Sequence, residues 1–580
     1  MNPPIAFQLL GLHPIDAIVI AVYLLGVTSV GFFVARHVKD LGGFVMPRWF
    51  GKSFMLMHSF GTGTHSDQAV GVASKTYSAG LSGIWYQWLW LFSTPFYWII
   101  APIMRRFRAY TTADVFEARF DRSVAGLFAG VCLIHQSYTM GLILLGSGKI
   151  IEATTGSAVR ADVAIYMMTV LFMVYGIAGG LAAAIITDFV QGILTVIFSF
   201  ILLPFILHAV GGIEGMHNSP ALDDQMLSLV APGEIGVFYI VMISLNALVS
   251  IVAIPVTMSA CGAGRTELDG QIGFTFGTFL KRICTVAWCM TGLAAVVYFA
   301  GQAGREEIDP DQIYGLVAND FLPRIAPGLL GLFLASLLAA VMSSCDSMMI
   351  AISALFTSNV YRPMVPNRSK GHYVWVARVA AAVVVTGGVV FALTMENVQV
   401  GMEVLWKLLA MMGIAFWLGL CWRRTTVVGA WAATLGAFAA WGLTNWPAFI
   451  QAVAETPYTQ FLQLTWGEGD DLQIYLPWQM LFYLTSGLAA GVFASLVTWP
   501  VAEEKLERFY ALIRTPVTPG EQVDQPCTLP PATEVPPKRL LLPGTGLEIL
   551  RPGVRSIGGF LFACALVVGI IVFVAVYVAK

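Results

Sequence analysis

The sequence predicts an all-α polytopic membrane protein with about fourteen transmembrane helices. The chain of 580 residues is 57% hydrophobic and only 11% charged. Its mean hydropathy of +0.76 lies well above that of soluble domains. Apolar stretches of about twenty residues recur from end to end, and each is long enough to cross a hydrocarbon core of roughly 30 Å as a helix.

The expected spans follow one another with short loops. The first is followed at once by "RHVKDLGGFVMPRWFGK" and lacks the charged n-region and cleavage site of a signal peptide, so we expect it to be retained. The longest gap contains "TPVTPGEQVDQPCTLPPATEVPPKRLLLPGTG" (515–546), whose composition is typical of an extended linker. The expected spans are 15–36, 50–75, 82–104, 124–147, 161–181, 185–210, 235–260, 272–301, 325–358, 372–395, 401–421, 427–446, 475–500 and 557–579.

The charge distribution predicts an orientation. If every span is crossed once, about 25 of the 32 Lys and Arg residues fall on one side, which the positive-inside rule makes cytoplasmic. Both termini then face outward, and we expect a multi-pass protein of the plasma (cell inner) membrane. The net charge of -2 hides this asymmetry and gives no indication of nucleic-acid binding.

Several function classes are not indicated. The chain has no Walker loop, no H-E-x-x-H and no nucleophile elbow, so we expect neither an ATP-driven pump nor an enzyme that hydrolyses substrates in the membrane. The eight cysteines are scattered without CxxC spacing, which predicts neither a disulfide framework nor a metal site of that type. An ion gradient is the expected energy source.

A polar stripe interrupts the apolar run "LLAAVMSSCDSMMI" (337–350). On a helix, Ala340, Ser343, Ser344 and Ser347 follow the i, i+3, i+4, i+7 pattern of one face, and Asp346 flanks that face. Small residues also permit close helix packing, and serines can bond to their own backbone. A carboxylate at membrane depth, however, costs roughly 2.5 kcal/mol and usually marks an ion path. Because hard cations prefer oxygen ligands, the stripe offers half of a cation site.

A second interruption, "HSFGTGTHSDQAVG" (58–71), offers the other half. Gly61 and other glycines stand beside Thr64, Asp67 and Gln68 inside an apolar span. This pattern predicts a broken helix whose unwound carbonyls face a cavity instead of lipid. The alternative is a flexible kink in which Asp67 has a structural partner.

Four motifs resemble the sodium/solute symporter family, which includes the sodium/glucose and sodium/proline transporters. The resemblance covers roughly residues 10 to 445. It implies a ten-helix inverted-repeat (leucine-transporter-like) core with sites at broken helices near the membrane midplane. The motifs are "YTTADVFEARF" (110–120), "YGIAGGLAAAIITDFVQG" (175–192), "GLFLASLLAAVMSSCDSMMIAISALFTSNVYRP" (331–363) and "GIAFWLGLCWRRTTVVGA" (413–430).

The resemblance also implies a division of the chain. The two five-helix repeats are expected at 50–210 and 235–421, with further segments around them. Those segments are an N-terminal extra helix (1–49), two peripheral helices (427–500), a cytoplasmic Pro-rich linker (503–556) and a C-terminal helix (557–580).

Carried over residue by residue, the resemblance implies a first sodium site. It consists of the carbonyls of Gly61, Thr64 and Ala340 and the hydroxyls of Ser343 and Ser344. By the same resemblance Asp188, in "IITDFVQG", stabilises a second sodium or guides its release. We expect that second sodium between Asp188 and the Asp346 and Ser347 end of the serine helix, because two neighbouring carboxylates repel unless a cation or proton lies between them. Asp188 has a structural alternative, in which it caps its helix or pairs with an arginine.

Candidate solute contacts come partly from the resemblance and partly from composition. By resemblance Asp67 and Gln87 stand at substrate or ion-path positions, and His135 and Tyr138 lie in a span that contributes substrate contacts; Gln68 lies beside the break and Trp85 in an aromatic run. Pro255 stands where the seventh span is expected to break, but the polar pairs of sugar transporters are missing, which counts against a hexose. Glu403 and Lys407, four residues apart, are expected to pair with each other.

These patterns predict a sodium-coupled secondary active symporter, with Na⁺ as the coupling ion. It would import a small polar organic solute, such as a sugar-like compound, sugar acid, amino acid or osmolyte, by alternating access, and would work as a monomer in the lipid bilayer. Two alternatives remain open. A transporter-like sensor would carry a signalling domain, and a proton-coupled carrier of the same fold would lack the serine pair.

Overall fold

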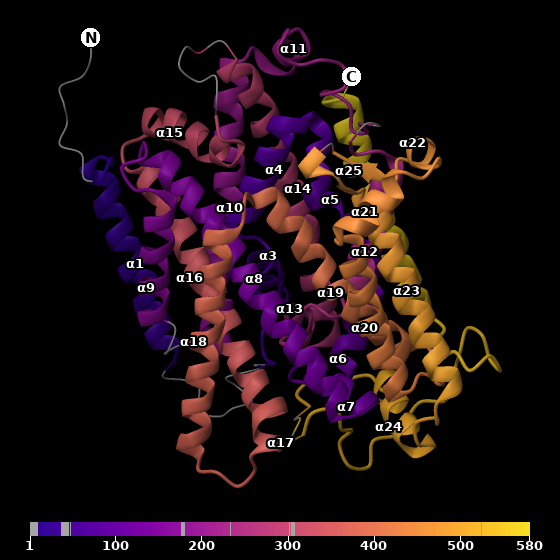
Figure 1. Cartoon of the computed structure of the whole chain (residues 1–580). Coiled ribbons are helices and arrows are strands. Elements are labelled where there is room, and N and C mark those ends of the chain that lie inside the picture. Colours follow the sequence, from indigo (N-terminus) through magenta and orange to yellow (C-terminus); the bar gives the residue numbers. More distant parts are fainter. Residues whose placement is uncertain are drawn as a thin grey trace.

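The computed structural model describes residues 10–35, 46, 48–175, 180–231, 234–300, 302, 308–467, 469–521, 523 and 525–579. It is a bundle of helices, most of which run along one common direction (Figure 1). Within the described part of the chain the only sheet is a short hairpin, in which β1 (Thr465–Trp466) pairs antiparallel with β2 (Gln473–Ile474), Thr465 opposite Ile474. The helical class predicted from composition is therefore confirmed.

The helices up to residue 262 include several short pieces. In chain order they are α1 (Pro14–Ala35), α3 (Lys52–Gly61), α4 (Ser66–Ala79), η1 (Gly80–Ile84), α5 (Trp85–Trp88), α6 (Thr94–Arg106), α7 (Thr112–Arg119), α8 (Arg122–Thr154), α9 (Ala161–Tyr175), α10 (Gly180–Ala209), α11 (Gly212–His217), α12 (Val237–Ser250) and α13 (Pro255–Gly262).

The helices after residue 262 include the serine-rich α16 and the final helix α25. In chain order they are α14 (Glu267–Phe299), η2 (Pro310–Gln312), α15 (Ile313–Ile325), α16 (Leu329–Leu355), η3 (Phe356–Tyr361), α17 (Arg362–Met364), α18 (Lys370–Thr394), α19 (Val398–Cys421), α20 (Val427–Thr444), α21 (Pro447–Ala454), α22 (Thr459–Leu462), η4 (Gly469–Asp471), α23 (Leu476–Val497), α24 (Glu503–Arg514) and α25 (Val554–Tyr577).

Polar caps set where several long helices begin. The Asp121 carboxylate accepts backbone N–H groups at the start of α8, and Thr266 forms a capping box with Asp269 at the start of α14. Asn397 and Thr426 cap α19 and α20 in the same way. Each cap gives acceptors to amide groups that the helix itself leaves without a partner.

Two of the expected spans are broken, as the glycines and Pro255 predict. The span expected at 50–75 is interrupted between Gly61, where α3 ends, and Ser66, where α4 begins. The span expected at 235–260 is interrupted between Ser250 and Pro255, and its two halves are bent by 65°. Pro255 occupies the first turn of α13, where its missing N–H group costs nothing.

The number of spans differs from a simple reading of hydropathy. In the described ranges eight helices are long and apolar enough to cross a membrane, or nine if α12 and α13 count as one span. The expected span at 82–104 is not one helix, because a turn at 89–93 separates α5 from α6. The predicted count of fourteen therefore stays a prediction.

α14 lies at the centre of the contacts around the broken helix α3/α4. It packs against α3, α4, α6 and α10. Glycines on α14 permit this approach, because a Cβ at Gly277 would lie 2.5 Å from the Leu56 carbonyl oxygen and one at Gly292 would lie 2.6 Å from that of Ala73. One turn after Gly277, α14 therefore lies close to the break between α3 and α4, where Lys281 donates to the Gly63 carbonyl.

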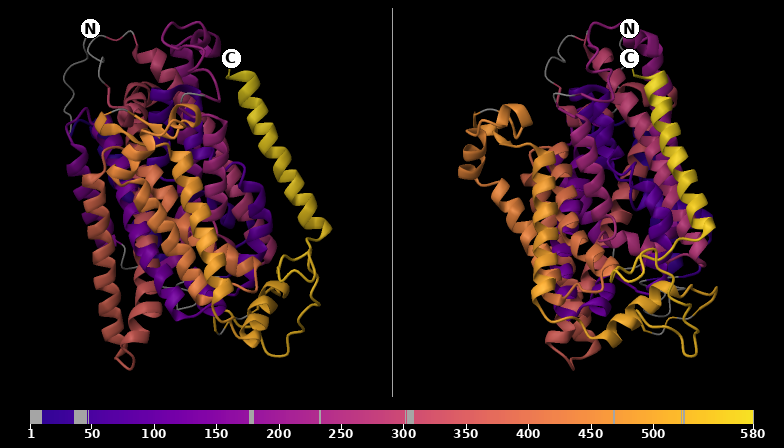
Figure 2. Two further views of the ribbon diagram at one scale, coloured as in Figure 1. Left: turned by 45° about the vertical axis from the view of Figure 1, so that its right-hand side comes forward. Right: turned by 90° about the vertical axis from the view of Figure 1, so that its right-hand side faces the viewer.

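The first and last helices stand at the margin of the bundle. α1 begins, and α25 ends, at the end of the molecule opposite α7, α17 and α24 (Figures 1 and 2). α25, the yellow helix, stands apart from the bundle in the left view of Figure 2 and lies along its edge in the right view; it packs against α6, where Gly559 lies against the Trp98 indole.

The segment between α23 and α25 is fixed to the rest of the molecule. It opens with α24, whose apolar face is buried; Phe509 stacks on Phe107 with ring centroids 5.5 Å apart, and the Tyr510 hydroxyl donates to the Gly419 carbonyl at 2.9 Å. The irregular chain beyond α24 returns to the end of α19, where Trp422 pairs with Leu547. The described residues between α24 and α25 are irregular, and both ends of this segment are held by contacts; that it acts as a linker stays a prediction.

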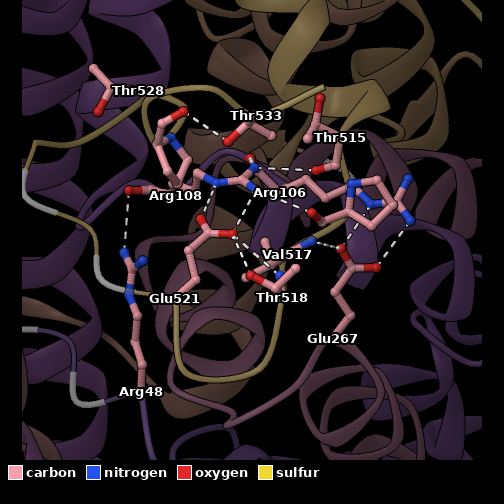
Figure 3. A network of polar contacts seen from close by, with 12 residues as sticks. Arg48, Arg106, Arg108, Glu267, Thr515, Val517, Thr518, Glu521, Thr528 and Thr533 are labelled. Carbon is pink, nitrogen blue, oxygen red and sulfur yellow. Dashed lines mark hydrogen bonds and ion pairs between the residues drawn. The ribbon is translucent and has the colours of Figure 1, made fainter. Parts of the chain in front are cut away.

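A group of charged residues holds the start of that irregular chain, and we call it the Arg108 cluster (Arg106, Arg108, Glu267, Glu521 and the backbone of 515–518; Figure 3). Arg108 is fully buried and pairs with the Glu521 carboxylate. Its other N–H groups donate to the carbonyls of Arg106, Thr515 and Pro516 at 2.9–3.2 Å. Glu267 accepts from Arg106 and from the Val517 amide. Every donor of the Arg108 guanidinium therefore has an acceptor.

Candidate functional site

The break in α3/α4 lies directly against α10. A Cβ at Gly61 would lie 3.3 Å from the Asp188 Cβ, so a side chain at position 61 would crowd that carboxylate. The Thr64 amide donates to the Gly61 carbonyl at 3.1 Å, which closes a tight turn between the two helices. The Thr64 hydroxyl is buried without a hydrogen-bond partner.

The serine face of α16 points at this break. Ser344 Oγ lies 3.1 Å from His65 Nδ1, and both side chains are buried. Ala340, one turn earlier, lines a small cavity together with Thr64 and His65. The predicted stripe and the predicted break are thus neighbours in space, although about 280 residues separate them in the sequence.

The Asp188 carboxylate joins the same cluster from α10. One oxygen accepts from Ser343 Oγ at 3.1 Å, and the other lies 3.1 Å from His58 Nδ1 on α3. Asp188 is 5% exposed. Its described partners are a serine and a histidine, and it lies inside α10 and not at its first residue, so among the described residues neither the arginine pair nor the helix cap of the structural alternative is formed.

Three helices therefore bring a carboxylate, two hydroxyls and unwound backbone to one buried point. His58 opens the motif "HSFGTGTHSDQAVG" but carries no predicted role; a histidine inside an apolar span, three residues before a glycine break, is the signal that identifies it. Asp346 and Ser347 lie on α16, but their side chains fall outside the described residues, so the second sodium site stays a prediction.

A larger cavity lies on the other side of the break. Residues from α4, α8, α13, α14 and α19 line it. Of the predicted solute contacts, Asp67, Gln68 and His135 are part of this lining. The Asp67 Oδ1 and Gln68 Oε1 atoms are buried in it without hydrogen-bond partners.

The other predicted solute contacts lie outside the lining of this cavity. Trp85 Nε1 donates to the Leu229 carbonyl at 2.8 Å, because α5 is a single turn that faces a loop. Gln87 is 1% exposed, and its carbonyl accepts from Arg282 at 3.0 Å. Tyr138 packs against Phe391, with ring centroids 5.1 Å apart, on the side of α8 that faces α18.

Two cations that were not among the predicted site residues also line the cavity. Lys281 and Arg282 of α14 are 7% and 2% exposed. Lys281 Nζ donates to the Gly63 carbonyl and lies 5.5 Å from the centroid of the Trp90 ring. Two adjacent cations inside the span expected at 272–301 were the available signal, because charged residues at membrane depth mark functional sites by default.

Glu403 and Lys407 do not form the expected direct ion pair, although the charge of Glu403 acts on Lys407. Glu403 accepts from the Tyr86 hydroxyl, and Lys407 Nζ donates to Gln479 Oε1 at 3.1 Å. The spacing of four residues allows a pair on an isolated helix, but here α5 and α23 offer closer partners. Both residues line a separate pocket with Lys75 and Glu234, which form an ion pair at the far end of α4.

A helical bundle with two broken helices, and a buried polar cluster beside a central cavity, has the architecture of a secondary transporter. The comparisons define the family. The chain belongs to the sodium:solute symporter family, whose model matches residues 44–436. It is therefore a multi-pass membrane transporter that couples the movement of a solute to sodium, and it is not an enzyme.

Curated relatives are similar over most of their length. The sodium/glucose cotransporter of Vibrio parahaemolyticus is 24% identical over 536 residues, which cover 84% of this chain and 91% of that protein. The sodium/pantothenate symporter of Escherichia coli is 22% identical, with 72% and 85% covered. The osmoregulated proline transporter OpuE of Bacillus subtilis is 24% identical, with 72% and 86% covered.

Among solved structures, a Na⁺-coupled sialic acid symporter in a substrate-bound outward-open state has a similar fold. It superposes with a TM-score of 0.64 at 17% sequence identity and covers 84% of this chain and 99% of that one. The expected leucine-transporter-like fold class is thus confirmed.

Proposed function

We propose that the protein imports a small polar organic solute, which binds in the central cavity between the two broken helices while sodium binds on the α16 side of the α3/α4 break. The observation that carries this proposal is the position of residues 62–65. On one side His65 contacts Ser344, and on the other Gly63 contacts Lys281 of the cavity. Both ligands then share one unwound segment.

The first sodium ion is assigned to the carbonyls of Gly61, Thr64 and Ala340 and the hydroxyls of Ser343 and Ser344. Support comes from their convergence, and from the nearby Asp188 carboxylate, which bonds to Ser343 at 3.1 Å. Oxygen ligands of this kind suit a hard cation, and the negative charge of Asp188 favours it further.

Replacing either serine with alanine tests this assignment. Ser343→Ala or Ser344→Ala removes one ligand from a site of about five. We expect the sodium concentration for half-maximal uptake into proteoliposomes to rise about tenfold, which corresponds to about 1.4 kcal/mol. Ser29→Ala is the matched control, because that exposed hydroxyl donates to the Leu25 carbonyl of its own helix α1, away from the site. Unchanged sodium dependence in both site variants would refute the assignment.

We further propose a second sodium ion near Asp188, toward Asp346 and Ser347. One sodium ion moving down ~100 mV yields roughly 2.3 kcal/mol, and a tenfold concentration ratio adds about 1.4 kcal/mol. A second ion doubles this free energy and squares the solute gradient. The sodium-to-solute ratio from reversal potentials is expected to be two, and to fall to one in Asp188→Asn. A ratio of one in the native protein would contradict the proposal.

The remaining assignments concern topology. We propose that residues 50–210 and 235–421 form inverted repeats; this is supported by a broken helix at the start of each, α3/α4 and α12/α13. The protein is proposed to lie in the cell inner membrane with α7, α17 and α24 on the cytoplasmic side and both termini outside. A monomer is proposed to suffice, because one chain supplies the lining of the cavity described above.

A further inference from the structure

The central cavity holds more positive than negative charge. Among the lining residues whose side chains the structure describes, Lys281 and Arg282 are cations and Asp67 is the carboxylate. Two cations against one carboxylate leave one positive charge if the histidines are neutral. A sodium ion bound beyond the break is balanced by the Asp188 carboxylate beside it and leaves this excess unchanged, so the cavity is suited to an anion.

The two cations are also incompletely bonded by the protein. Lys281 Nζ, which has three N–H donors, donates to the Gly63 carbonyl. Arg282 donates to the Gln87 carbonyl at 3.0 Å, while its Nε is buried without an acceptor. Arg282 also bonds to the Tyr97 hydroxyl. The charge of Asp67 acts on Lys281 across the cavity, but neither cation forms a direct ion pair with a carboxylate of the described residues.

Acceptors without donors stand elsewhere in the same cavity. Asp67 Oδ1 and Gln68 Oε1, both in the first turn of α4, are buried and have no donor. Buried polar atoms in native proteins are normally satisfied, so these oxygens need N–H or O–H groups from a ligand. Trp90, Tyr97 and Phe274 add aromatic surface to the wall.

We propose that the solute is a small hydroxylated carboxylate, with its carboxylate bound by Lys281 beside Arg282 and its hydroxyl groups directed to Asp67 and Gln68. This inference rests on the proposed function, because it takes the central cavity as the solute site. A neutral polyol would satisfy the acceptors but leave the excess positive charge in place. A zwitterionic amino acid carries no net charge and would leave the same excess.

The test uses two pairs of solutes that differ in one group. Gluconate is compared with sorbitol, and lactate with propylene glycol; each pair exchanges a carboxylate for an alcohol on the same carbon chain. Uptake of the labelled compounds into proteoliposomes of the full-length protein is measured with and without an inward sodium gradient. The variants are Lys281→Gln, Lys281→Arg and, as the matched control, Lys52→Gln, whose lysine is exposed at the start of α3.

We expect sodium-dependent uptake of at least one acid but not of its alcohol. Lys281→Gln is expected to raise the half-saturating acid concentration at least tenfold, Lys281→Arg to recover part of that loss, and Lys52→Gln to change nothing. The recovery by arginine separates a charge contact with the solute from a packing role of the lysine stem.

Three results would overturn the inference. They are uptake of the alcohols alone, no uptake of either acid with or without sodium, and acid uptake that Lys281→Gln leaves unchanged. Acid uptake that is sensitive to Lys281→Gln but identical without sodium would instead refute the sodium coupling of the proposed function while supporting the carboxylate site.

Discussion

Arg108 at the α24 end of the molecule and Arg282 in the central cavity are both buried arginines, but the protein treats them differently. Arg108 has an acceptor for every N–H group, among them the Glu521 carboxylate (Figure 3). Arg282 lies beside Lys281, has no carboxylate partner among the described residues and leaves Nε unbonded.

The difference distinguishes a structural cation from a ligand-binding one. Breaking a complete buried ion pair leaves an uncompensated charge and is costly, whereas removing a cation that lacks its counter-ion removes an existing cost. The Arg108 cluster should therefore lose stability on mutation. Substitution of a cation in the central cavity should weaken solute binding, and the stability of the solute-free protein should stay the same or rise.

The largest expected effect is at Arg108. Arg108→Ala leaves Glu521, whose side chain is 6% exposed, without its cation. We expect a loss of roughly 3 kcal/mol and a lower melting temperature in detergent, measured by intrinsic fluorescence. The segment that follows α24 should also become more sensitive to limited proteolysis. If Arg108→Ala melted at the same temperature as the native protein, the structural role assigned to Arg108 would be wrong.

Glu521 gives the same pair a pH dependence. Burial raises the pKa of Glu521, but the hydrogen bonds and charge of Arg108 outweigh burial and hold the pKa below its ordinary value of 4.5. The stabilisation is therefore complete above pH 4.5 and is lost as the pH falls through the lower, folded-state pKa. We expect Glu521→Gln to cost about 2 kcal/mol near neutral pH. The melting temperatures of the variant and the native protein should converge below pH 4.5; a gap that widens in acid would contradict this assignment.

A smaller effect of opposite sign is expected in the cavity. Lys281→Gln should leave the solute-free melting temperature unchanged or raise it slightly, by at most about 1 kcal/mol of stability, because it removes a buried cation that has no direct ion pair and interacts with Asp67 only across the cavity. The measurement is the same melt, without solute and at fixed sodium. A fall as large as that of Arg108→Ala would show that Lys281 is a structural residue.

The smallest effect is expected at an exposed pair on α24. Arg508 and Glu504 form an i, i+4 pair with side chains 76% and 79% exposed. Such pairs contribute at most about 0.5 kcal/mol, so the melting temperature of Arg508→Ala should equal that of the native protein. It serves as the matched control for Arg108→Ala, and a clear loss here would mean that alanine substitution near α24 is destabilising for other reasons.

The sequence was sufficient for features that depend on local pattern. Hydropathy predicts the helical class, and the glycines around residue 61 and Pro255 predict the two breaks, because these residues act on the backbone where they stand. The helical period predicts that Ala340, Ser343 and Ser344 share a face. That face lies against the break, as the serine pattern requires.

What the sequence could not supply depends on which neighbour comes closest in space. Glu403 and Lys407 have the spacing of a pair, yet Tyr86 and Gln479 are their partners because α5 and α23 pack beside α19. Tyr138 lies on the same helix as His135 but faces α18 instead of the cavity. Lys281 was overlooked because a hydropathy average over 272–301 conceals two adjacent charges.

The break at residues 62–65 has a thermodynamic consequence, since the proposed sodium and solute sites both include it. Sodium stabilises one conformation of these residues. Because the solute site includes the same residues, solute affinity differs between that conformation and the others. The factor by which saturating sodium changes solute affinity must then equal the factor by which saturating solute changes sodium affinity. The effect of sodium on the solute binding curve and the effect of solute on the sodium binding curve therefore give the same coupling free energy, which is typically about 1–3 kcal/mol.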